Sequence, residues 1–443
     1  MSTLELTASA RLKALLKNRY AQLAVLVLML AGYAFAIVAG VVGSPVGSSN
    51  FSIVFVWIAW WAALILVAVP LLGRGWCSVC PIPIPGEWLQ RGNVLGPHGR
   101  QPRWRGLRWP RQLRNIWLQS AAFLLLALFS IVLLTTPLVT AVVLGSMLVA
   151  ATALGMVFQR RSFCRYLCPV GGFIGLYSQV APVELRVKDK LICISCEGKP
   201  CYNGSARGYG CPWDVFPGGL SRNTYCGLCM ECLRTCPHDN IAVNLRAFAS
   251  DLNQPAGRLD EAFKSFVMLG SALIYSAVLL GPWGALKDAA YRIGSSAWFV
   301  YVVSFLVIIC LVLPGLFALC ASPGRDARAF RLRFSRLSSA LIPLGLAAWI
   351  AFSLSFILTN GTYVLASLSD PLNLGWNLFG TSGLAWQPLL SAVLAPTQSL
   401  ALTGGFVWSG TLAHKVASES RISSVPAVLY AGAVTLLLMR LLL

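Results

Sequence analysis

The chain has 443 residues, of which 57% are hydrophobic and only 11% are charged. A soluble chain of this length would carry roughly 25% charged residues, so the composition indicates a membrane protein and argues against a soluble enzyme. The formal net charge of +20 would also suit a nucleic-acid-binding protein, but the placement of the basic residues argues against that class of partner.

The N-terminal segment, residues 1–20, is basic and is predicted to lie in the cytoplasm. It contains Arg11, Lys13, Lys17 and Arg19 and leads directly into a long apolar run. Because that run is long enough to span a bilayer, we expect a retained first helix and not a cleaved signal peptide.

Nine apolar runs of roughly 20 residues are candidates for transmembrane helices. They are residues 21–42, 51–73, 115–136, 139–158, 265–284, 297–319, 338–359, 386–408 and 425–443. The eighth contains Pro396, so it could be broken or re-entrant, and eight spans is the alternative. The basic clusters fall in alternate loops, which predicts an N-terminus inside and a C-terminus outside.

Cysteine–proline loops follow the second and fourth runs. The cysteines are Cys77 and Cys80 before Pro81, and Cys164 and Cys168 before Pro169; Cys320, after the sixth run, is a weaker echo. The predicted topology places these loops at one depth on the cytoplasmic face, where four thiolates could meet. They could hold a third metal or iron–sulfur centre, form a redox-active dithiol pair, or be structural turns without metal.

The segment Arg100–Arg114 lies between the second and third runs and combines many arginines with Trp104 and Trp109. It could be a basic–aromatic patch for nucleic acid. The preferred interpretation is a juxtamembrane segment on anionic lipid headgroups, so lipid is the expected partner and nucleic acid is not.

The longest hydrophilic stretch, residues 182–250, carries the strongest chemical signal. Its second cysteine run is Cys226-x2-Cys229-x2-Cys232-x3-Cys236-Pro237, which is the spacing of bacterial ferredoxins. In two-cluster ferredoxins the fourth cysteine of each run binds the other cluster. The first [4Fe-4S] cluster is therefore assigned to Cys193, Cys196, Cys201 and Cys236, and the second to Cys211, Cys226, Cys229 and Cys232.

The first cysteine run departs from that spacing. Four residues separate Cys196 from Cys201, and nine separate Cys201 from Cys211, with several glycines among them. We expect this insertion to form a loop over the first cluster. Two zinc ions, each held by four thiolates, are the alternative. The second run with its closing proline favours iron–sulfur clusters.

Haem is not expected within this chain. The three histidines, His98, His238 and His414, form no pair within the apolar runs, and no C-x-x-C-H motif is present.

The cysteine–proline loops and the two-cluster segment together resemble the membrane polyferredoxin family. That family includes the quinol-oxidising membrane subunit of periplasmic nitrate reductase systems, the membrane electron-transfer protein of nitrous oxide respiration, and an accessory protein of cytochrome oxidase assembly. The resemblance covers about residues 20–245. It implies a multi-pass protein of the cell inner (cytoplasmic) membrane with its clusters on the cytoplasmic side. The chain departs from the family in having two residues, not three, between Cys77 and Cys80.

The predicted fold class is an all-α polytopic membrane protein of about nine transmembrane helices, with its N-terminus inside and a small α+β ferredoxin-like segment inserted. Beyond the basic segment 1–20, residues 21–180 should form a four-helix core that carries the cysteine–proline loops. Residues 181–255 should form the two-cluster segment, and residues 256–443 a C-terminal region of about five helices whose role the resemblance does not assign.

The leading functional hypothesis is electron transfer between a cytoplasmic redox partner and either the membrane quinone pool or an outward-facing c-type cytochrome or iron–sulfur partner subunit. The sequence allows flow in either direction and identifies no catalytic residue. The chain would be a quinone oxidoreductase subunit or a simple carrier. The alternative is an accessory metal-maturation protein, similar to the cytochrome oxidase assembly member, that uses its clusters as reductant.

Overall fold

The computed structural model describes residues 3–96, 106–280, 284–321 and 326–443. The chain divides into two compact units. The first comprises Met1–Phe35, Val67–Gln119 and Val143–Asp251, and the second Ala36–Leu66, Ser120–Val142 and Leu252–Leu443. Of the segment Arg100–Arg114, predicted to contact lipid, residues 100–105 lie outside the described part.

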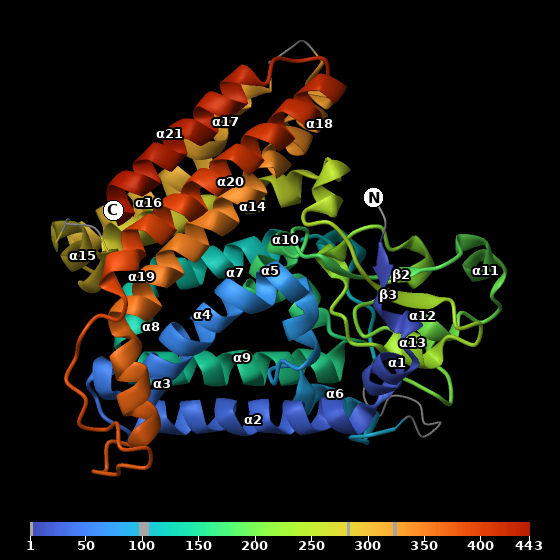
Figure 1. Cartoon of the computed structure of the whole chain (residues 1–443), viewed down its shortest axis with the longest axis horizontal. Helices are drawn as coiled ribbons and strands as arrows, with labels where there is room; N and C mark the ends of the chain where they lie inside the picture. The colour runs from blue at the N-terminus through green and yellow to red at the C-terminus, as the bar shows by residue number, and fades with distance from the viewer. Residues whose placement is uncertain (1–2, 97–105, 281–283, 322–325) are drawn as a thin grey trace. The chain divides into compact units, whose positions relative to one another are not determined.

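Within the described ranges, seven helices are long and apolar enough to cross a membrane. They are Arg19–Val42 (α2), Phe51–Ser78, Pro137–Val157 (α9), Leu259–Leu280, Ser296–Cys320, Ala327–Ser369 and Val425–Leu442 (α21). They confirm the prediction of a mostly helical, multi-pass membrane protein (Figure 1).

Two predicted spans are not among these seven helices. The run 115–136 is divided at Phe129 into α7 (Trp117–Leu128) and α8 (Ser130–Thr135), each shorter than a membrane span. The run 386–408 falls in α20 (Ser391–Glu419), which continues through Pro396. The possible break at Pro396 does not occur in this helix, because the proline lies close to the helix start and removes only an early backbone hydrogen bond. The total of nine spans stays a prediction.

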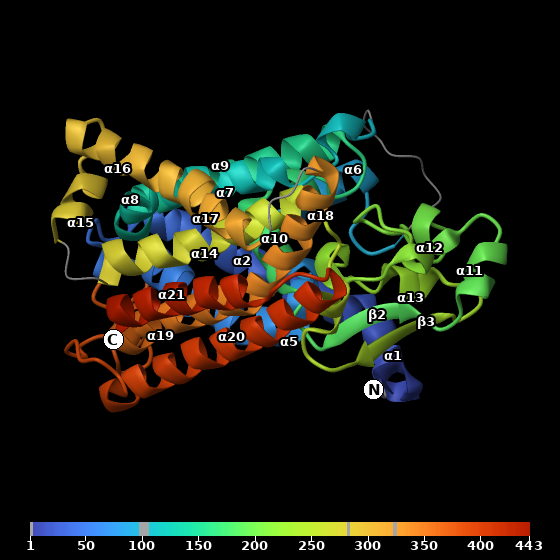
Figure 2. The ribbon, with the colours of Figure 1, turned by 90° about the horizontal axis from the view of Figure 1, so that it is seen from above.

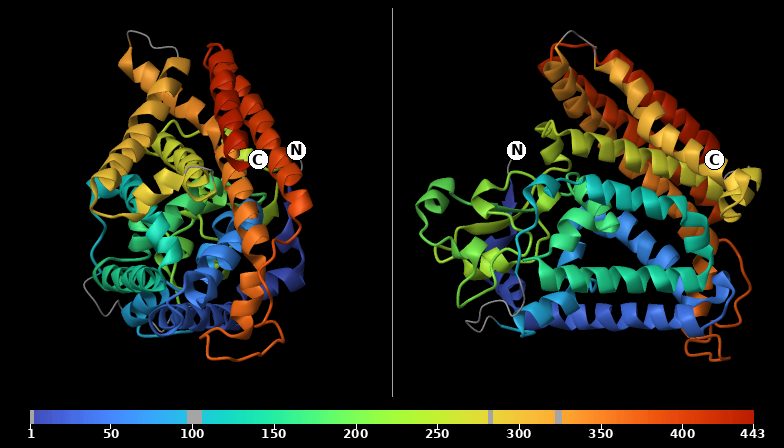
Figure 3. Two further views of the ribbon diagram at one scale, coloured as in Figure 1. Left: turned by 90° about the vertical axis from the view of Figure 1, so that its left-hand side faces the viewer. Right: turned by 180° about the vertical axis from the view of Figure 1, so that it is seen from behind.

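The second unit is organised around α19 (Ile342–Ser369), which packs against α14 (Leu259–Tyr275) and α20. Trp349 of α19 is fully buried, and its Nε1 donates to the carbonyl of Met268 at 3.0 Å. Figure 3 shows α19, α20 and α21 running alongside one another. The other helices of this unit are α3 (Phe51–Ile53), α4 (Trp61–Ala63), α15 (Gly284–Tyr291), α16 (Ser296–Val307), α17 (Leu313–Cys320) and α18 (Ala327–Leu337).

The first unit contains a three-stranded antiparallel sheet in the order β1–β3–β2. The strands are β1 (Leu4–Glu5), β2 (Val183–Val187) and β3 (Ile241–Leu245). Val187 pairs with Ile241 at the end of β2 from which the cysteine-rich stretch departs. The pairing of β2 with β3 therefore holds the two ends of that stretch together (Figure 2).

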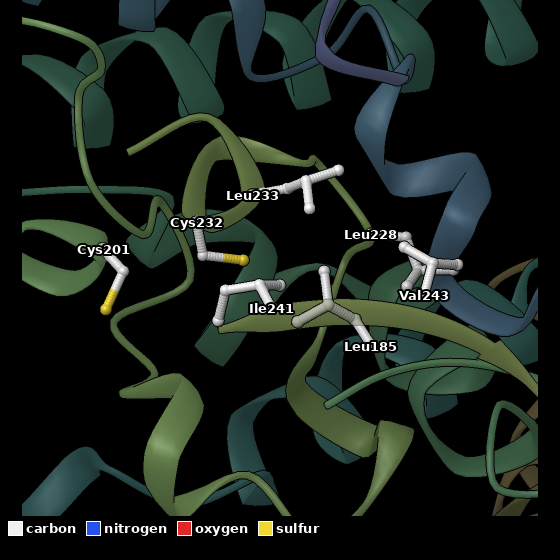
Figure 4. Packing of buried hydrophobic residues seen from close by; sticks show 7 residues of the cluster. All are labelled: Leu185, Cys201, Leu228, Cys232, Leu233, Ile241 and Val243. Atoms are coloured by element: carbon white, nitrogen blue, oxygen red, sulfur yellow. The ribbon is translucent and has the colours of Figure 1, made fainter. Parts of the chain in front are cut away.

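One apolar core connects this sheet to the cysteine-bearing loops. Ile241 and Val243 of β3 are two residues apart, so their side chains lie on the same face of the strand. They form a buried cluster with Leu185 of β2 and with Leu228 and Leu233 from the second cysteine run (Figure 4). Cys201 and Cys232 belong to the same cluster, so the packing of the core fixes the position of these ligand loops.

The first unit also contains a set of short helices. They are α1 (Ala10–Lys17), α5 (Val69–Leu72), α6 (Ile84–Arg91), α10 (Pro169–Tyr177), α11 (Lys190–Ser195), α12 (Pro200–Asn203) and α13 (Glu231–Thr235). The Asp189 side chain accepts from the Leu191 N–H and begins α11. The Cys168 sulfur accepts from the Gly171 N–H at 3.2 Å, and Pro169 occupies the first turn of α10.

Candidate iron–sulfur sites

The first cluster site is a small hollow whose wall contains Cys193, Cys196, Cys201 and Cys236. Cys193 lies on α11, Cys201 lies on α12, and Cys196 and Cys236 directly follow α11 and α13. The rest of the wall is mainly apolar and includes Phe216 and Ile241. The structure thus brings together the four cysteines assigned to the first cluster.

The second cluster site is a small hollow whose wall contains Cys211, Cys226, Cys229 and Cys232. Cys232 comes from α13, and the other three come from loops. Trp213, two residues after Cys211, forms another part of the wall. The four cysteines assigned to the second cluster therefore surround one apolar hollow, and Cys211 reaches it from outside the second cysteine run.

The arrangement of these thiols fits a group larger than a single ion. Across the residues that the structure describes, no three or more Cys, His, Asp or Glu side chains stand close enough to share one metal ion. Thiolates around one zinc ion would each lie about 2.3 Å from it. A [4Fe-4S] core places iron and sulfide atoms between four thiolates, and each hollow is lined by four cysteines together with apolar side chains.

Hydrogen bonds to sulfur organise the first cluster site. The side chain of Asn240 donates to Cys193 Sγ at 3.3 Å, and its backbone N–H donates to Cys236 Sγ at the same distance. The amide is itself fixed, because Nδ2 donates to the Asp189 carbonyl and Oδ1 accepts from the Asp189 N–H. Such bonds stabilise negative charge on the ligands and are one of the determinants of cluster potential.

Burial dominates the electrostatics of the second cluster site. It raises the pKa of Cys226 to about 11 and raises the pKa of Cys229 and Cys232 as well, with further increases from the neighbouring thiolates. Free thiols in this setting stay protonated at neutral pH. Binding of a metal cluster would require the thiolate forms and would release the protons.

The cysteine–proline loops bring their four thiols into one neighbourhood. Cys77, Cys164 and Cys168 are buried, and Cys80 is half-buried. Burial raises the pKa of Cys164 and Cys80, and the nearby charge of other thiols in this set raises both further. Cys320, the weaker echo, lies at the end of α17 in the second unit. The structure therefore brings together the four loop cysteines, within reach of one another's charge.

Three residues at the second cluster site escaped the sequence analysis. Trp213 is 1% exposed, and the guanidinium carbons of Arg74 and Arg161 lie 4.4 Å and 6.0 Å from its ring centre. The repeated spacing R-x-x-C, in Arg74-x2-Cys77 and Arg161-x2-Cys164, was available as a signal. It indicates that each cysteine–proline loop delivers one arginine in the same way.

Two comparisons relate this chain to known proteins. A family described as a 4Fe-4S binding domain matches residues 53–111 and 139–188. These segments contain all four cysteines of the cysteine–proline loops and end before Cys193. The second match is the Escherichia coli (strain K12) protein named "Putative electron transport protein YccM", which is 29% identical over 255 residues, or 52% of this chain and 68% of that protein.

No solved structure matches the chain. The chain thus contains two segments of 4Fe-4S binding-domain type, together with helices suited to spanning a membrane. By these findings the chain is similar to membrane-type 4Fe-4S electron transport proteins.

Proposed function

We propose that this chain is a membrane-bound electron-transfer protein with one [4Fe-4S] cluster at each of the two cluster sites. The observation that carries the proposal is the pair of hollows, each lined by the four cysteines that the crossed ferredoxin pattern assigns to it. Bound clusters would supply one-electron redox chemistry. The chain's own residues supply the thiolates, hold them apart, and surround them with apolar side chains.

The partners follow from the predicted orientation. The positive-inside pattern puts the cysteine-rich segment on the cytoplasmic side, where a cytoplasmic redox partner would exchange electrons with it. The other partner would be the membrane quinone pool or an outward-facing cytochrome. The printed name of the relative, an electron transport protein, supports this class of function.

A third hollow favours a quinone as one redox partner. It is partly open, and it extends from Leu23 and Leu26 of α2 to Cys229 and Arg161. An apolar wall from a membrane-spanning helix and a polar end beside a ligand of the second cluster site suit an amphipathic quinone. This hollow would bring the quinone headgroup next to the redox centre.

Electron exchange is the direct test. Protein purified without oxygen and reduced with dithionite should be reoxidised over many cycles by excess of a quinone analogue or a c-type cytochrome, followed by the visible absorbance of the clusters. Leu26→Trp, which fills the third hollow, should slow reoxidation by the quinone analogue at least tenfold. Leu28→Trp is the matched control, because Leu28 is 66% exposed on the same helix. Stoichiometric reoxidation without turnover would contradict the proposal.

A second candidate function is metal handling by the cysteine–proline loops, as in a maturation protein or at a third centre. Two observations favour it: the four thiols share one electrostatic neighbourhood, and the 4Fe-4S family match covers these loops. The variants Cys77→Ser and Cys164→Ser distinguish metal handling from electron transfer as the role of these loops. Loss of bound metal in both variants, with electron exchange unchanged, would favour metal handling over electron transfer as the role of the loops.

A further inference from the structure

Buried positive charge lies against the second cluster site. Arg74 is 2% exposed, and its guanidinium stacks on Trp213, which forms part of the wall of that site. It donates to the carbonyl oxygens of Gly171, at 2.9 Å, and Thr224. Thr224 comes two residues before Cys226, so the charge is attached to the loop that supplies a second-site ligand.

The fold reserves space for this cation. Gly171 and Gly175 lie one turn apart on α10 and face the guanidinium, and a Cβ at Gly175 would lie 3.1 Å from Arg74 Nη1. Any larger residue would compete with Arg74 for this space. The backbone of α10 and the ring of Trp213 therefore hold Arg74 in a fixed position.

The charge of Arg74 differs from that of Arg161 in its partners. Among the described residues no carboxylate pairs with Arg74, whereas the equally buried Arg161 is paired with Glu87 at 2.6 Å. An unpaired buried cation is strongly destabilising, because it loses its hydration without gaining an opposite charge. That cost is offset if an anion occupies the neighbouring hollow, and a cubane with four thiolate ligands is an anion.

The first cluster site has a different charge environment. Asp189 adds a negative charge that raises the pKa of Cys193, after the larger effect of burial. Lys199 lies over the ring of Phe216 at 5.0 Å, but its side chain is exposed, so water and salt screen it. The two sites thus differ in charge, because the buried guanidinium of Arg74 lies beside the second site and the cation near the first site is exposed.

We propose, building on the function proposed above, that Arg74 sets the reduction potential of the second cluster above that of the first. Reduction adds one negative charge to a cluster, and a cation in a low-dielectric setting stabilises the reduced form. An electron entering the chain would therefore rest at the second site, beside the cysteine–proline loops. Arg74 is a positioning residue in this role, because it acts through charge and does not bind the cluster.

The test is a potentiometric titration of the full-length, anaerobically purified protein, followed by low-temperature EPR. Arg74→Gln should shift the reduction equilibrium of one cluster about tenfold toward the oxidised form, which is 59 mV for one electron, and leave the other cluster unchanged. Arg74→Lys keeps the charge and should restore most of the shift. The double variant Lys188→Gln/Glu5→Gln removes a partly exposed ion pair and should change neither potential.

Equal shifts in both clusters, or no shift in an Arg74→Gln protein that retains its iron, would overturn the proposal. If Arg74→Gln loses its iron, Cys211→Ser is compared with the wild-type protein, in which Arg74 is present. Cys211→Ser must alter the cluster of higher reduction potential. Alteration of the cluster of lower reduction potential overturns the inference. Wild-type protein without iron would refute the proposed function itself, so the two failures are distinguishable.

Discussion

The two cluster sites share one cysteine-rich segment but are enclosed in different ways. The first lies among short helices close to the surface, where Leu191 and Ile194 on either side of Cys193 are each 72% exposed. The second is closed by Trp213, and Arg74, a residue that comes before the third predicted span, packs on the ring of Trp213. The first site is thus mainly local in sequence, whereas the second depends on contacts with distant segments.

This difference has a functional consequence. A site near the surface suits exchange with a soluble partner, and its potential responds to water and to hydrogen bonds such as those from Asn240. A buried site beside fixed charges has a potential set by the fold. Under the proposed function, the first site would receive the electron and the second site would hold it.

Loss of a single ligand should have the largest effect and tests whether the sites are crossed. Cys211→Ser should remove or alter the second cluster, and Cys236→Ser the first, although Cys236 belongs to the second cysteine run. Iron content and EPR of each variant measure this, and each variant should lose up to about half of its iron. The comparison fails if Cys211→Ser alters the same cluster as Cys193→Ser.

Removal of the Trp213 ring should be the next largest effect. Trp213→Ala should lower the free energy of unfolding by about 3–5 kcal/mol and release iron from the second site, because the indole is fully buried. Phe216→Ala at the first site is the matched variant, and it should cost less because Phe216 is only half-buried. Thermal unfolding in mild detergent, followed together with cluster absorbance, measures both; equal losses would contradict the difference between the sites.

Crowding at Gly227 should have a moderate effect. A Cβ there would collide with the indole of Trp213, so Gly227→Ala should destabilise the second site by about 1–3 kcal/mol. Gly219→Ala provides the control, since a Cβ at Gly219 would meet open space. Chemical unfolding of the two variants should differ; if both behave like the wild type, the contact between Trp213 and the ligand loop is not tight.

The smallest effect is expected at an ion pair near the first site. Lys13 of α1 lowers the pKa of Asp239, chiefly through a side-chain hydrogen bond. A lowered pKa means that the pair stabilises the fold above the unfolded pKa of about 3.9 and loses this contribution as pH falls through the folded value. Asp239→Asn should therefore cost about 0.2–1 kcal/mol at neutral pH, and the difference from wild type should vanish in acid.

Thermal unfolding of both proteins, at pH values from neutral to roughly pH 3, measures this dependence. If the difference in stability between wild type and Asp239→Asn grew as the pH fell, the prediction would be contradicted.

Sequence reasoning succeeded where the determinants are local. The hydropathy of α2 and the spacing of Cys226, Cys229 and Cys232 concern residues that are close together in the chain. It failed where the determinants are distant. The two-residue strand β1 has no periodicity of its own and forms because Leu4 pairs with Leu245.

The environment of the second site could not be predicted from the sequence either, because it also depends on contacts between distant segments. Trp213 lies outside the spacing of the cluster cysteines, and only the packing of α10 against the loop before Cys226 brings Arg74 beside it. The split of the run 115–136 at Phe129 was also missed, since its composition is uniformly apolar. Ligand spacing could be predicted from the chain, but the residues that tune the ligands could not.

The most direct test of two cubanes at crossed cysteine sites is the metal content of anaerobically purified protein, determined together with its low-temperature EPR spectrum after dithionite reduction. The account predicts about eight irons per chain and two interacting [4Fe-4S] signals; about twelve irons would add a third cluster at Cys77, Cys80, Cys164 and Cys168. Zinc in place of iron, with no EPR signal on reduction, would contradict the account.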